Sequence, residues 1–200
     1  MIWSKKVLTS YQTASKYLGL ELWYNFDMLT LEQEKWIGHL SDTDIIEIFP
    51  FDTSSVEKFD KVKQKIQSVL GAETEVVHKG ATSLKISGQG ELDIYVPVPP
   101  EKFDAMVANL EKIFGKPRSL YPLERARFVY YIDSTKAEVF AINDQCKGWL
   151  ESEAFEGYLR SHADELKAYE TLKEQGNRLS CREYYRRKIG FINNILSKVQ

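Results

Sequence analysis

The sequence predicts an α/β protein, a small mixed β-sheet flanked by helices, with helical additions at the N-terminal and C-terminal ends. In some segments, such as Glu91–Val98, every second residue is apolar, which is typical of half-buried strands. In others, such as residues 56–69, apolar residues recur at helical spacing. Both patterns occur in the middle of the chain, whereas the ends show helical spacing, and no repeat or long linker divides the chain. A single mixed layer of strands covered by helices accounts for this order.

The composition excludes several classes of protein. The chain has 200 residues, of which 43% are hydrophobic and 28% charged, enough for one well-packed domain. Its 27 basic and 29 acidic side chains give a net charge of -2, so long nucleic acid is an unlikely partner. No apolar run reaches membrane-spanning or signal-peptide length, so we expect a cytoplasmic protein with no membrane partner. Cys146 and Cys181 lack zinc-ligand spacing and are predicted to be free thiols.

Residues 1–43 are predicted to form a helical extension to a domain over residues 44–200. Three of the four tryptophans lie in this extension, which indicates a surface that docks on the domain or on a second copy in a homodimer. The predicted elements are a helix within Lys6–Leu22 and a helix over Leu31–Leu40 that opens with a capping box of Thr30 and Gln33.

The domain is predicted to begin with alternating strands and helices. Turn residues, capping residues and the period of the apolar positions set the expected boundaries. In order, they are a strand over Ile45–Phe51, a helix from a Ser54/Glu57 capping box to Gly71, a strand over Thr74–His78, a turn at Gly80–Ser83 and a strand over Glu91–Val98.

The second half continues with a helix, two strands and a helical end. The helix is expected to start at Pro99-Pro100 and to end at Gly115, a typical C-cap residue. The remaining elements are strands over Arg127–Ile132 and Lys136–Asn143, helices from about Trp149, and a last helix from the N-cap Ser180 to about Ser197.

Glu91 and Asp93 are the most informative acidic pair. Chance alone gives about four acid-x-acid pairs at this composition, and the chain has five. This pair differs because Leu92, Ile94 and Val96 alternate with it, which puts both carboxylates on one face of a strand. Side chains two residues apart in a strand are about 7 Å apart, so both could reach metal ions about 3.5 to 4 Å apart. A solvent-facing strand would show the same pattern.

The turn His78-Lys79-Gly80-Ala81-Thr82-Ser83 precedes that strand. Gly80 allows close approach of the backbone, the hydroxyls of Thr82 and Ser83 are available, and a helix starting here would aim N–H groups at an anion. This composition is also that of an ordinary turn. His78 could also have a structural role, in which its side chain forms a hydrogen bond and shapes the loop.

The motifs resemble those of the GrpB family, whose members have the nucleotidyltransferase fold. The resemblance spans roughly residues 45–200 and leaves the first 43 or so uncovered. The residues that carry it are His78–Ser83, Gly90–Ile94 and Trp149 with Phe155–His162, supported by Ile46–Asp52, Tyr169 with Lys173, and Tyr185 with Lys188 and Phe191-Ile192.

The resemblance implies a metal-dependent transferase that moves a nucleoside monophosphate from an NTP to an unknown small-molecule or macromolecular acceptor. Glu91, Asp93 and Glu138 would be the catalytic carboxylates and would bind Mg²⁺ or Mn²⁺. The nucleotide phosphates would be held by Gly80, Ala81, Thr82, Ser83, Lys79, Lys85 and Arg127.

Two departures from the family pattern bear on activity. The family has Gly-Ser where this chain has Gly80-Ala81, so Thr82 or Ser83 would have to supply the missing hydroxyl. GrpB proteins often have histidines at the positions of Glu138 and Phe140, whereas active nucleotidyltransferases carry a third carboxylate on that strand. Glu138 would complete the set, or it would be an ordinary exposed glutamate. The alternative function is an inactive module of the same fold that binds a nucleotide or a phosphorylated metabolite.

Overall fold

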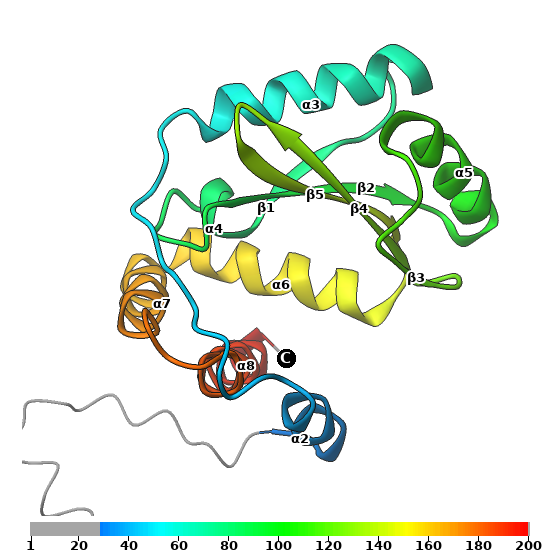
Figure 1. Cartoon of the computed structure of the whole chain (residues 1–200). Helices are drawn as coiled ribbons and strands as arrows, with labels where there is room; N and C mark the ends of the chain where they lie inside the picture. The colour runs from blue at the N-terminus through cyan, green and yellow to red at the C-terminus, as the bar shows by residue number, and fades with distance from the viewer. Residues whose placement is uncertain (1–28, 200) are drawn as a thin grey trace, which may run out of the picture.

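The computed structural model describes residues 29–199, and its centre is a five-stranded mixed sheet in the order β1-β2-β5-β4-β3 (Figure 1). β2 and β5 run parallel, and the other neighbours are antiparallel. The strands are β1 (Val77–Lys79), β2 (Glu91–Val98), β3 (Ser119–Tyr121), β4 (Arg125–Ile132) and β5 (Thr135–Asn143). The predicted mixed sheet flanked by helices is therefore confirmed.

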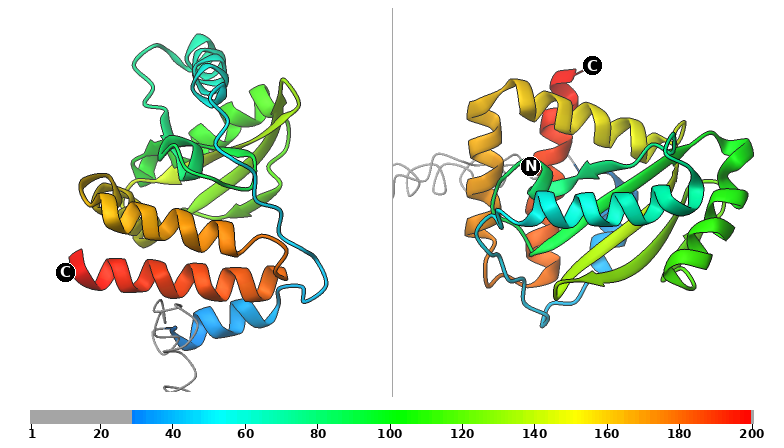
Figure 2. Two further views of the ribbon diagram at one scale, coloured as in Figure 1. Left: turned by 90° about the vertical axis from the view of Figure 1, so that its left-hand side faces the viewer. Right: turned by 90° about the horizontal axis from the view of Figure 1, so that it is seen from above.

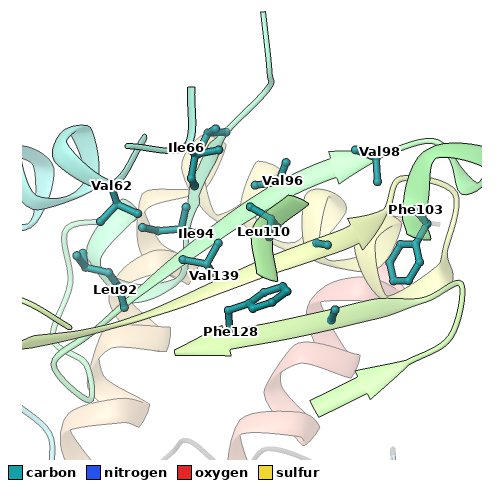
Figure 3. Close-up of a cluster of buried hydrophobic side chains, with 14 residues drawn as sticks. Val62, Ile66, Leu92, Ile94, Val96, Val98, Phe103, Leu110, Phe128 and Val139 are labelled. Atoms are coloured by element: carbon teal, nitrogen blue, oxygen red, sulfur yellow. The ribbon is translucent and has the colours of Figure 1, made fainter. Parts of the chain in front are cut away.

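Helices α3 (Ser55–Leu70) and α5 (Phe103–Phe114) cover one face of the sheet, the upper face in Figure 1. Leu92, Ile94 and Phe128 have no exposed surface on this side and pack against both helices (Figure 3). Each buried side chain of this size stabilises the fold by about 1.5 to 3 kcal/mol relative to an exposed one. The main hydrophobic core lies here.

Three C-terminal helices lie on the opposite face. α6 (Lys147–Ser161) runs directly under the sheet, and α7 (Ala163–Gln175) and α8 (Cys181–Val199) pack beneath it (Figures 1 and 2). A second apolar cluster, which includes Phe155, Leu172 and Phe191, joins these helices to one another. α6 also packs on the sheet, because Trp149 contacts Tyr95 of β2, which stacks on Phe140 of β5. The polar groups of this face are at the end of the sheet where β2 begins.

Helix α2 (Leu31–Gly38) packs on the far side of α8 (Figure 2). Its predicted capping box is present, because Thr30 and Gln33 bond each other's backbone N–H groups at 3.2 and 2.9 Å. Trp36 contacts Tyr185 edge to face, with ring centroids 5.5 Å apart. The predicted helix within Lys6–Leu22, Trp3 and Trp23 lie outside the described residues, and the homodimer stays a prediction.

The predicted strand over Ile45–Phe51 is wrong. The segment is extended, but it forms only isolated bridges, from Ile45 to Ser180 and from Phe49 to Gly88. Its two partners belong to different parts of the fold, and Pro50 has no N–H to donate, so no ladder develops. The segment instead links α2 and α8 to the layer of the sheet.

The start of α3 and the short elements also differ from expectation. Ser54 precedes α3, but its hydroxyl donates to Asp52 at 2.6 Å and caps no helical N–H, so the predicted capping box is absent. β1 is shorter and later than predicted, the Gly80–Ser83 turn is a single helical turn (α4), and edge strand β3 was missed. Short elements like these depend on pairing more than on local pattern.

The longer predicted elements agree with the structure. β2 has the predicted bounds, α5 ends before Gly115 with its φ at +80°, and the Ser180 hydroxyl accepts the Glu183 N–H at 3.3 Å at the start of α8. No helix among residues 29–199 is long and apolar enough to cross a membrane. Cys146 and Cys181 are free, as expected.

Candidate functional site

Three carboxylates share the sheet face that lies over the C-terminal helices. Glu91 and Asp93 project from β2 on the side opposite the buried Leu92 and Ile94. The parallel register pairs Asp93 with Glu138 on β5, so these residues lie side by side on neighbouring strands. The fold thus brings together the three acids that the sequence singled out.

Protein cations already neutralise two of these acids. Lys136 Nζ lies 2.7 Å from a carboxylate oxygen of Glu91 and 2.7 Å from one of Glu138. Arg127 on β4 reaches Glu138 at 3.1 Å. Burial lowers the pKa of Lys136, but its bonds to both carboxylates outweigh burial and leave the pKa raised. Over residues 29–199, no group of three or more His, Cys, Asp or Glu side chains is arranged to hold a metal ion.

Asp93 is the least neutralised of the three. Burial raises its pKa to about 6; Lys188 opposes this shift, and Glu138 and Glu91 add to it. Gly80 lies against this carboxylate, and its φ is +76°. A Cβ at position 80 would overlap the Asp93 side chain, so only glycine satisfies both the backbone angle and the close approach.

The predicted phosphate-binding turn holds an internal carboxylate. The Gly80 N–H donates to Glu156 on α6 at 2.7 Å, and the Ser83 hydroxyl donates to the same carboxylate at 3.3 Å. Lys79 is buried and pairs with Glu153 at 2.7 Å and with Glu156 at 3.4 Å. Glu156 therefore occupies the donors that were expected to bind the nucleotide phosphates.

The other residues predicted to bind phosphate are dispersed. The Thr82 hydroxyl bonds His78 Nε2 at 2.9 Å, and burial lowers the pKa of His78 to about 4. That ring also stacks on Phe59 of α3, which supports a structural role for His78. Ala81 packs against the apolar cluster of the C-terminal helices, and Lys85 is exposed. Of the predicted cations, Arg127 alone pairs with one of the three acids.

A pocket opens beside the start of β2. Its lining includes Phe49, Asp52, Ala81, Thr82 and Glu91. Glu91 is thus the one carboxylate of the three that borders this pocket. Asp93 and Glu138 lie further along their strands, on the sheet face that is turned toward the C-terminal helices.

Four residues of the site were not assigned a role from the sequence. Lys136 lies two residues before Glu138, and strand periodicity alone places it on the same face. The segment around Glu156, together with Lys173 and Lys188, belongs to the motifs that resemble the GrpB family. The resemblance gave none of these residues a role. These residues come from β5, α6, α7 and α8, so only the folded chain shows how each is placed around the turn and the three acids.

Comparison with known proteins identifies the family. The sequence model described as GrpB protein matches residues 45–198, and the chain belongs to the GrpB family. The predicted boundary at residues 43/44 stays a prediction. A search of curated proteins finds no match.

One solved structure supports the fold. The crystal structure of conserved protein GrpB from Enterococcus faecalis matches with a TM-score of 0.59 at 23% identity, covering 76% of this chain and 96% of that one. This likeness shows the fold alone. Polymerase beta of Leishmania infantum matches with a TM-score of 0.41 at 11% identity, covering 80% and 70% of the two chains. That score is too low to support an argument about function.

Proposed function

We propose that this GrpB protein is a metal-dependent nucleotidyltransferase, which moves a nucleoside monophosphate from an NTP to an acceptor. The observation that carries the proposal is the register of β2 and β5, which pairs Asp93 with Glu138 while Glu91 shares their face. Adjacent carboxylates on one face of a sheet are the arrangement that metal-assisted phosphoryl chemistry uses.

The donor chemistry fits a hard divalent cation. Carboxylate oxygens are the ligands preferred by Mg²⁺ and Mn²⁺. The Lys136 ammonium, 2.7 Å from both Glu91 and Glu138, is a stand-in cation that shows positive charge to be accommodated between those acids. Glu91, Asp93 and Glu138 would hold the ion after Lys136 turns away. When bound, Mg²⁺ or Mn²⁺ would offset phosphate charge and lower the pKa of an acceptor hydroxyl.

The residues around the acids would orient the nucleotide. Transfer forms a bond from an acceptor oxygen to the α-phosphorus and breaks the bond between that phosphorus and the departing pyrophosphate. Where the acceptor is a hydroxyl, its proton passes to water. The Gly80 N–H is directed toward an anion, and a phosphate could take it only if the Glu156 carboxylate moved away. Lys79 and Arg127 are close enough to this face to offset phosphate charge once their present carboxylate partners exchange for the ligand.

The test is calorimetry with each NTP plus Mg²⁺ or Mn²⁺, together with an assay of pyrophosphate release. We expect metal-dependent binding that weakens about tenfold or more in Asp93→Asn, because the amide keeps the shape and loses the charge. Asp104→Asn, an exposed acid on α5, is the matched control and should bind as the wild type does. Metal-dependent binding that is absent at millimolar NTP, or unchanged in Asp93→Asn, contradicts the proposal.

A second candidate is an inactive module that binds a nucleotide or phosphorylated metabolite. The pairing of Lys136 with two of the acids, and of Glu156 with the turn, favours it, because both contacts compete with a metal and a phosphate. The two candidates separate on turnover. A freshly purified sample that binds NTP and releases no pyrophosphate from any of the four would support the inactive module.

A further inference from the structure

Lys173 and Lys188 are two cations that the proposed chemistry leaves unused. Lys173 lies on α7 and is 4% exposed, and Lys188 lies half-buried on α8. Within residues 29–199, neither ammonium makes a hydrogen bond or an ion pair. Each ammonium lies over an aromatic ring: Lys173 Nζ is 5.2 Å from the ring centre of Tyr169, and Lys188 Nζ is 5.3 Å from that of Tyr185.

The other cations around the site have carboxylate partners. Lys79 pairs with Glu153 and Glu156, Lys136 with Glu91 and Glu138, Arg127 with Glu138, and Arg160 with Glu156. A buried charge without a partner is destabilising, because the protein interior replaces water poorly. Among residues 29–199, the acids whose charges act on both ammonium groups are Asp93 and Glu91, and neither forms a direct ion pair with them. The two lysines are therefore able to accept an added anion.

Two contacts place these lysines opposite the start of β2. Glu174, next to Lys173, accepts the Ser87 hydroxyl at 3.0 Å. The Gln89 side chain lies close enough to Tyr185 to act on the pKa of its hydroxyl. Ser87 and Gln89 belong to the loop that leads into Glu91. α7 and α8 are therefore docked on this loop, with their lysines near the acid row.

The electrostatics agree with this placement. Burial lowers the pKa of Lys173 to about 7, and the nearby Lys188 charge lowers it further while Asp93 and Glu91 raise it. Burial also lowers the pKa of Lys188, with Asp93 and Glu91 again opposing the shift. Lys136 and Arg127 already neutralise Glu91 and Glu138, so Asp93 is the one nearby carboxylate of the three left for the two ammonium groups. Two like charges that act on each other with one acid beside them favour a further anion.

We propose that Lys173 and Lys188 form an anion site for the phosphate chain of a nucleotide, built by α7 and α8 across from Glu91 and Asp93. Lysine recognises phosphate as a point charge, and a chain of phosphates has enough oxygens to contact an ammonium on each of two helices. The anion site rests on the proposed function, in which these two lysines would hold the outgoing phosphates. It does not require the metal, because the lysines themselves supply the charge.

The probe is inorganic triphosphate, titrated by calorimetry at low salt and pH 6.5 in the presence of EDTA. We expect binding by the full chain, weakened about tenfold or more in Lys173→Met and in Lys188→Met, with the double variant weakest. Lys167→Met, an exposed lysine of α7 paired with Glu170, is the matched control and should bind as the wild type does. Lys188→Arg keeps the charge and should retain more binding than Lys188→Met.

Thermal unfolding without ligand checks that the variants fold. Methionine keeps the apolar stem and removes a buried, unpaired charge, so the midpoints should be unchanged or raised. Inorganic phosphate and NTP are the two further arms. Binding of triphosphate and NTP well above that of phosphate supports a site for a phosphate chain, whereas equal binding of all three contradicts it.

Two outcomes overturn the inference: no triphosphate binding in EDTA, or binding that the double variant leaves unchanged. Failure of the proposed function is a different result. Lysine-dependent binding in EDTA without pyrophosphate release on adding metal and NTP would remove the transferase activity and keep the anion site. Metal-dependent turnover that is insensitive to both lysine variants would remove the anion site and keep the transferase.

Discussion

The two faces of the sheet differ in what they bury. The face under α3 and α5 buries apolar side chains such as Leu92, Ile94 and Phe128, which form the main core (Figure 3). The face over α6, α7 and α8 carries a row of acids with lysines between and beneath them. One face therefore supplies the stability that lets the other keep costly charged groups, as functional sites commonly do.

The sharpest test of this division compares one substitution on each face. Phe128→Ala should lower the free energy of unfolding by about 3 to 5 kcal/mol, because it opens a cavity in a fully buried core. Lys136→Met should cost about 1 to 2 kcal/mol, since Glu138 keeps Arg127 and the methionine keeps the apolar stem. Urea unfolding measures both. A larger loss in Lys136→Met than in Phe128→Ala would show that the polar face carries the stability.

A second substitution tests whether Glu156 blocks the turn. Glu156→Gln keeps an oxygen for the Gly80 N–H but removes the negative charge beside Lys79 and Arg160. We expect a loss of about 1 to 3 kcal/mol in stability, together with tighter binding of triphosphate, because the released cations attract the ligand. Calorimetry beside urea unfolding checks both changes. Weaker triphosphate binding in the variant would mean that Glu156 supports the site instead of blocking it.

The smallest expected effect concerns pH and His78, which joins the turn to α3 through Thr82 and Phe59. Burial, with Arg160, holds the pKa of His78 at about 4, below its usual 6.5. Between these values the unfolded chain takes up the proton and the folded chain does not, so stability falls as the pH drops from about 6.5 to 4.

His78→Gln should reduce this acid-dependent loss by about 1 to 2 kcal/mol, after allowance for the partial exposure of the ring. Urea unfolding at pH 7 and at pH 4.5 gives the difference for each protein. An identical pH dependence in the wild type and the variant would show that His78 titrates in the folded chain as it does in the unfolded one.

Local pattern predicted those parts of the fold that depend on local chemistry. The bounds of β2 followed from strict alternation ended by Pro99-Pro100, and α5 ended where Gly115 provides a positive φ. The same alternation placed Glu91 and Asp93 on one face. By contrast, Ile45–Phe51 has the composition of a strand but finds no continuous partner, and sequence pattern does not reveal pairing.

The contacts that modify the site could not be predicted, because they join distant segments. Glu156 reaches the Gly80 N–H across 76 positions of the chain, and Lys136 reaches Glu91 across 45. Both contacts depend on the docking of α6 or on the register of β2 against β5. The Glu156 segment, Lys173 and Lys188 are among the residues that resemble the GrpB family. Their neighbours are known only once the helices are packed under the sheet.

In the proposed reaction, the acid row on the polar face binds a metal and a nucleotide. Paramagnetic broadening of backbone amide NMR signals by Mn²⁺ with NTP tests it most directly. We expect the signals of Glu91–Asp93 and Lys136–Glu138 to broaden first, while those of α3 and α5 stay sharp. Asp93→Asn should reduce the effect. Broadening that is absent at millimolar Mn²⁺ and NTP, or that is centred on exposed acids elsewhere, would contradict it.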